Sequence, residues 1–99
     1  MGAHESFRVF RYKRIFAKLM PDLRRLELPI LSDDERFRIM KETYNLLKQI
    51  GEYVIDDWRL SDSQQDELLE IVKELLRYVK RSPRFKEIWE YTLKHSHAA

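Results

Sequence analysis

The chain has 99 residues, of which 36% are charged and 43% hydrophobic, and 19 basic against 17 acidic side chains leave a net charge of +2. This length suits one domain, and the hydrophobic content is too high for a disordered chain. The absence of cysteine excludes disulfides, thiolate metal sites and thiol catalysis. Because no apolar run approaches the roughly 18 residues of a transmembrane helix, we expect a soluble, cytoplasmic protein.

The composition predicts an all-α fold. Only two glycines and three prolines occur, too few for the turns of an all-β chain, and helix formers dominate. We expect a single domain over residues 1–99, a compact bundle of four main helices with a short extra helical turn between Pro21 and Pro29. Residues 1–5 and 95–99 are expected to be frayed tails. The scarcity of Asn and Cys beside many charged residues is typical of thermophilic proteins.

The first helix is expected from Ser6 to Met20, because its apolar residues fall on one arc of a helical wheel. Pro21 is expected to interrupt it, and a short continuation over residues 22–28 then ends before Pro29. The residues predicted to face the core are Val9, Tyr12, Ile15, Phe16, Leu19 and Met20.

The second helix is expected to begin at Ser32, which forms a capping box with Glu35. Apolar residues cover more than half of its circumference, so we expect it at the centre of the bundle. A second box, Ser61 with Gln64, predicts the start of the third helix.

The third helix is expected to end near Arg81. Ser82 and Pro83 then fit the N-cap and first position of a fourth helix. The fourth helix is expected to present Phe85, Ile88, Trp89 and Leu93 to the core.

Charge is segregated along the chain. Residues 1–30 hold seven bases and three acids, residues 31–76 hold six bases and twelve acids, and residues 77–99 hold six bases and two acids. The small total therefore hides segments of +4, −6 and +4. The net charge of each segment, rather than that of the whole chain, therefore indicates what kind of charged partner the protein binds.

The first basic cluster lies on one face of the first helix. Arg11, Arg14 and Lys18 fall within about 60° of each other on the wheel, opposite the apolar arc, with Phe7 in the same sector and Phe10 at its border. Cations suit phosphates and an exposed ring suits a base, as in single-strand binding. The alternative is an ordinary solvated face with Phe7 packed against the last helix.

The second basic cluster comprises Arg77, Lys80, Arg81, Arg84 and Lys86, at the junction of the third and fourth helices. Arg84 and Lys86 have no evident helix-stabilising reason to stand at a helix start, which favours an anionic ligand there. The resemblance to DNA-reading helix-turn-helix units is poor, since the turn has no glycine and the last helix has no Asn or Gln to read adenine.

Neither a metal site nor catalysis is expected. The carboxylates of Asp66, Glu70 and Glu74 form a helical ladder without the Glu-x-x-His partner of a di-metal site. The three histidines, at positions 4, 95 and 97, lie near the ends of the chain, so no base is placed to activate a nucleophile. We expect no enzyme, no metal and no cofactor.

Gly51 is an unusual residue for the interior of the second helix, where it costs about 1 kcal/mol relative to Ala. We expect it to allow close packing by another helix of the same chain. The alternatives are a local break in the helix or a self-association face.

The leading hypothesis is a small, non-enzymatic nucleic-acid-binding domain that contacts phosphates of DNA or RNA, without sequence specificity, through both basic clusters. The alternative is a small accessory subunit, or a homodimer, assembled through complementary acidic and basic segments. The first hypothesis requires the two clusters to share one face.

Overall fold

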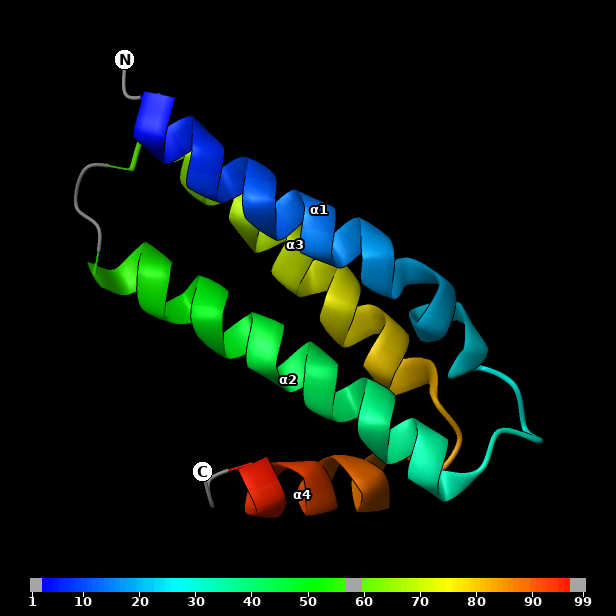
Figure 1. Cartoon of the computed structure of the whole chain (residues 1–99). Helices are drawn as coiled ribbons and strands as arrows, with labels where there is room; N and C mark the ends of the chain where they lie inside the picture. The colour runs from blue at the N-terminus through cyan, green and yellow to red at the C-terminus, as the bar shows by residue number, and fades with distance from the viewer. Residues whose placement is uncertain (1–2, 57–59, 97–99) are drawn as a thin grey trace.

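The computed structural model describes the backbone of residues 3–56 and 60–96. It contains α1 (Ala3–Arg25), α2 (Asp33–Asp56), α3 (Asp62–Arg81) and α4 (Phe85–Ser96), and these described ranges hold no strand. The predicted all-α bundle of four helices is confirmed (Figure 1). None of the described helices is both long and apolar enough to span a bilayer.

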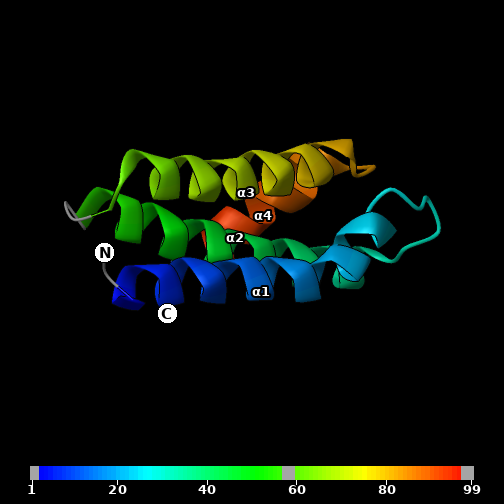
Figure 2. The ribbon, with the colours of Figure 1, turned by 90° about the horizontal axis from the view of Figure 1, so that it is seen from above.

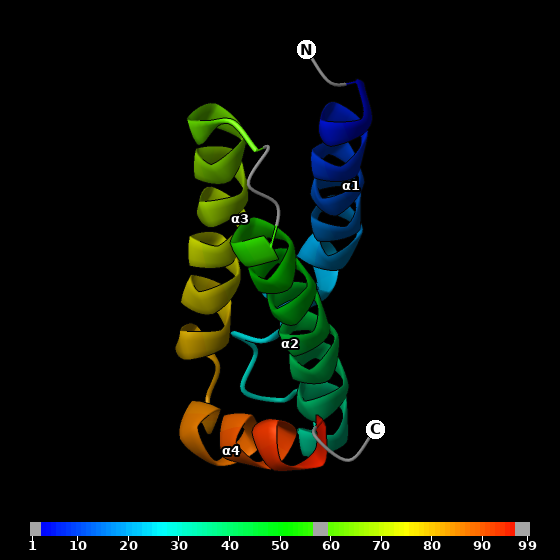
Figure 3. The same cartoon turned by 90° about the vertical axis from the view of Figure 1, so that its left-hand side faces the viewer.

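The helix α2 is central, as its wide apolar arc predicts. It packs against each of the other three helices. The helices α1 and α3 run in one direction and α2 in the other (Figures 1 and 2). The short α4 crosses α2 on the side away from α1 (Figure 3), and within the described residues α4 touches α2 and α3 but not α1.

The core forms where the apolar arcs of the four helices meet. Val9, Tyr12 and Leu19 of the arc predicted for α1 are buried, and its other three members pack against the core. Burying one such side chain stabilises the fold by about 1.5–3 kcal/mol. The other buried apolar residues of this core are Leu23, Leu26, Ile39, Met40, Leu46, Ile50, Tyr53, Leu60, Leu68, Ile71, Leu75, Val79 and Ile88.

Pro21 does not interrupt α1, which continues to Arg25. A proline inside a helix costs about 3 kcal/mol through its missing N–H and its ring clash. The next turn buries Leu23 and Leu26 completely. At about 1.5–3 kcal/mol each, these two leucines offset the cost of the proline, so the expected break and separate short turn are replaced by one longer helix.

A buried arginine joins the two connections at one end of the bundle. The Arg36 side chain is 2% exposed, and its guanidinium donates to the carbonyl of Leu26 at 2.7 Å, to the carbonyl of Leu28 and to Ser82 Oγ at 2.9 Å. No carboxylate of the described chain lies within ion-pair distance of it. Arg36 therefore ties the α1–α2 connection to the α3–α4 junction.

The N-cap role expected of Ser82 is wrong. Ser82 is the C-cap of α3, its N–H donates to the Val79 carbonyl, and its hydroxyl is held by Arg36. The helix α4 instead begins at Phe85, after Arg84, whose φ of 59° lies in the left-handed region. The capping box of Ser61 and Gln64 is confirmed.

The box predicted at Ser32 forms only in part. The Ser32 hydroxyl accepts the Glu35 N–H at 3.2 Å, as expected. The Glu35 carboxylate instead accepts from Arg38 at 3.0 Å and pairs with Arg25 at 3.4 Å. The first turn of α2 is therefore fixed partly by an ion pair to the end of α1.

The helices also extend into the expected tails. The helix α1 begins at Ala3 and α4 ends at Ser96, and the remaining residues of those tails lie outside the described ranges, as do His97 and Trp58. The His95 ring stacks on Tyr91 with 3.8 Å between ring centroids. His95 is therefore part of an ordered helix end rather than of a frayed tail.

The expected close packing at Gly51 is wrong. A Cβ placed on Gly51 would meet nothing within 4 Å, and α2 runs unbroken through this position. Because α4 lies over the first half of α2, through pairs such as Phe37 with Tyr91 and Tyr44 with Trp89, it does not reach this part of the helix.

Replacing Arg36 by methionine leaves two backbone carbonyls and one hydroxyl without their donor in a buried joint. Each unpaired group costs about 1–3 kcal/mol, so we expect Arg36→Met to lower the free energy of unfolding by about 3 kcal/mol or more. Urea unfolding followed by circular dichroism measures this. The matched control is Arg38→Met, which removes an exposed guanidinium from the same helix and is expected to cost under about 1 kcal/mol. Equal losses in the two variants would contradict the role of Arg36.

Replacing Gly51 by alanine adds a methyl group in open space and improves helix propensity. We expect Gly51→Ala to raise the free energy of unfolding by up to about 1 kcal/mol, and Gly51→Ser to raise it less. The same urea experiment measures both. A destabilised Gly51→Ala variant would show that the position requires glycine for a reason other than space within this chain.

Candidate nucleic-acid interface

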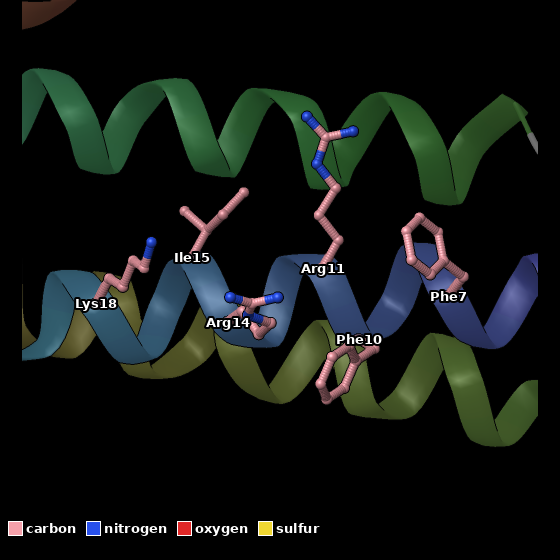
Figure 4. A pocket seen from close by; sticks show the side chains of 6 residues that line it. All are labelled: Phe7, Phe10, Arg11, Arg14, Ile15 and Lys18. Atoms are coloured by element: carbon pink, nitrogen blue, oxygen red, sulfur yellow. The ribbon is translucent and has the colours of Figure 1, made fainter.

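The outer face of α1 carries a shallow hollow of about 160 Å³. All the residues that line it come from this one helix (Figure 4). Figure 4 shows Phe7, Arg11 and Ile15 directed toward the side of α2, Arg14 in front of the helix and Phe10 directed to the opposite side. We call this the α1 surface; its residues are Phe7, Phe10, Arg11, Arg14, Ile15 and Lys18.

The five basic residues of α1 between Arg8 and Lys18 divide into two groups by their contacts. On its two flanks, Arg8 lies over the Tyr53 ring of α2 at 4.9 Å, and Lys13 pairs with Glu67 of α3 at 2.6 Å. Arg11, Arg14 and Lys18 have no acidic partner within ion-pair distance among the described residues. The flanking cations therefore contact the neighbouring helices, and Arg11, Arg14 and Lys18 are available to a ligand.

Two phenylalanine rings of the α1 surface are exposed to solvent. Phe7 is 69% exposed and Phe10 is 56% exposed, whereas the other three phenylalanines of the chain pack against the core. The expected alternative, in which Phe7 packs against the last helix, is wrong, because α1 does not touch α4 within the described residues. Leaving such a ring exposed forgoes about 1.5–3 kcal/mol of burial.

The Phe10 ring already has a cationic neighbour. The Arg14 guanidinium carbon lies 6.0 Å from its centroid, within the range of a cation–π contact. A planar guanidinium and an aromatic ring thus lie together at the surface, next to the unpaired charges of Arg11 and Lys18.

The second cluster is partly neutralised by nearby acids. Arg77 pairs with Glu74 on the preceding turn of α3, and Arg84 pairs with Asp33 of α2 and with Glu87 of α4. Arg84 therefore has a structural role, which the sequence-based expectation for this residue missed. Lys80, Arg81 and Lys86 are exposed, and none is in an ion pair with the described acids.

The left-handed conformation of Arg84 ordinarily costs a non-glycine residue about 1–2 kcal/mol, and in this conformation its side chain pairs with Asp33 and Glu87. A hydrogen bond from Arg84 lowers the pKa of the Glu87 carboxyl, and Arg38 does the same for Glu35. Both carboxylates therefore stay charged to a lower pH than usual, and their contribution to stability is lost only as the pH falls through these lowered pKa values.

The structure does not bring the whole second cluster beside the first. The start of α4, with Arg84 and Lys86, follows α3 and is fixed to Asp33 of α2, while α1 and α4 do not meet in the described chain. A single continuous phosphate-tracking surface across both clusters therefore lacks support, and the α1 surface is separate from the start of α4.

A larger hollow, of about 420 Å³, lies between α2 and α4 and was not foreseen from the sequence. Its walls combine the aromatic rings of Phe37 and Tyr91 with the paired charges of Asp33, Arg84 and Glu87. Across the part of the chain that is described, no group of three or more His, Cys, Asp or Glu side chains could hold a metal ion.

Comparison of the chain with protein-family models, with curated proteins and with solved structures finds no match. The α1 surface is the place where unpaired charge and exposed aromatic rings coincide.

Proposed function

We propose that this protein is a small non-enzymatic nucleic-acid-binding domain, and that the α1 surface is its principal contact. The observation that carries the proposal is the set of outward cations, Arg11, Arg14 and Lys18, which lie together on one helix without acidic partners in the described chain. A phosphate backbone supplies the missing negative charge, and release of its counterions supplies most of the affinity.

The charge pattern also motivates the alternative of assembly with a second copy or a partner protein. However, several opposite charges of different segments already meet inside one molecule, as in the pairs of Lys13 with Glu67 and Arg84 with Asp33. Exposed pairs of this kind contribute little to stability, but they use charges that an intermolecular contact would require. This favours the nucleic-acid proposal over charge-driven assembly.

Reversing charge on the α1 surface is expected to weaken binding without unfolding the helix. In fluorescence polarisation at low salt with a labelled oligonucleotide, Arg11→Glu combined with Arg14→Glu is expected to raise Kd at least tenfold. Three cations in contact with phosphates also predict a salt dependence for the unmodified protein. The logarithm of its association constant is expected to fall with the logarithm of the salt concentration, with a slope of about −2 to −3.

The matched control is Lys48→Glu combined with Lys73→Glu, which changes the net charge equally through exposed lysines of α2 and α3 that lie outside both clusters. This control is expected to change Kd far less than the α1 variant. Equal weakening by both pairs would mean that only net charge matters. Absence of binding to any DNA or RNA at low salt would refute the proposed function.

A further inference from the structure

We infer that the α1 surface takes single-stranded rather than duplex nucleic acid, with Phe7 and Phe10 as platforms on which unpaired bases stack. This inference rests on the proposed function and specifies its ligand. It follows from the coincidence, on the α1 surface, of two exposed rings with three cations that have no acidic partner among the described residues.

The rings distinguish the two forms of nucleic acid. In a duplex the bases are stacked on one another, so a convex helix surface reaches phosphates and groove edges but not base faces. A single strand offers unstacked bases, and stacking on aromatic side chains tolerates any sequence because every base has a π face. Duplex binding would use Arg11, Arg14 and Lys18 and leave Phe7 and Phe10 in water.

The Arg14 guanidinium over the Phe10 ring adds to this argument. Guanidinium planes and aromatic rings are both surfaces on which splayed bases stack. Their proximity, 6.0 Å between the guanidinium carbon and the ring centroid, places two such surfaces at one point of the helix. Arg11 and Lys18 lie on the same surface, where they contact the phosphates of the neighbouring nucleotides.

The length of the surface sets the size of the ligand. From Phe7 to Lys18 the helix rises about 17 Å. Nucleotides in a duplex strand rise about 3.4 Å each, and unstacked nucleotides extend further, so the surface accommodates at most about five. Affinity is therefore expected to increase with oligonucleotide length up to about five nucleotides and to change little beyond.

An anionic lipid surface shares the phosphate chemistry but fits this face less well. Helices that lie in a membrane interface bury a broad apolar face and keep their cations apart from it. On α1 the broad apolar face is the one buried against α2 and α3, and the two exposed rings lie among the cations.

The test compares fluorescein-labelled ten-nucleotide oligo-dT and oligo-U with a ten-base-pair duplex, by fluorescence polarisation at low salt. Single strands are expected to bind at least tenfold tighter than the duplex. Phe7→Leu combined with Phe10→Leu is expected to weaken single-strand binding about tenfold or more and to leave duplex binding unchanged. Leucine keeps apolar bulk but has no π face. Tryptophan at both positions is expected to retain binding.

Because both rings are exposed, these variants are expected to keep the helicity of the parent protein, which circular dichroism checks. Equal affinity for duplex and single strands, with unchanged binding by the leucine variant, would overturn the inference. The proposed function would survive that result if Arg11→Glu with Arg14→Glu still weakened binding. Co-sedimentation with phosphatidylserine vesicles, together with no binding to nucleic acid, would overturn both.

Discussion

The buried guanidinium of Arg36 is the interaction on which the arrangement of the four helices depends. It carries a positive charge in the core without a carboxylate partner in the described chain, and it donates to two carbonyls just after α1 and to the Ser82 hydroxyl at the end of α3. Those carbonyls lie near the negative end of the α1 dipole, which also favours a cation. Groups from three separate parts of the sequence are thereby fixed at one point.

The direction in which α4 leaves this joint determines what the bundle exposes. Held by Ser82 and by the pairing of Arg84 with Asp33, α4 crosses the first half of α2 and leaves α1 alone. The contacts of α1 are with α2 and α3, through its apolar arc and the flanking cations Arg8 and Lys13. Its outward face is therefore left with charges and rings that no described element covers.

Local features of the structure could be predicted from the sequence, and features that depend on distant contacts could not. The Ser61 box and the apolar arcs involve neighbouring residues, so spacing alone indicates them. Continuation through Pro21 depends on the burial of Leu23 and Leu26 by other helices, and the role of Ser82 depends on an arginine 46 residues earlier. For the same reason a helical wheel groups Arg11, Arg14 and Lys18 but does not reveal that Arg84 meets Asp33.

Residue-by-residue mapping of the contact tests most directly whether single-stranded nucleic acid binds on the α1 surface. Titrating isotope-labelled protein with ten-nucleotide oligo-dT and following backbone and side-chain NMR signals locates the binding surface. We expect the largest shifts over residues 7–18, including the Phe7 and Phe10 rings, and small shifts over α4. Shifts concentrated at the α3–α4 junction, or no shifts at all, would contradict it.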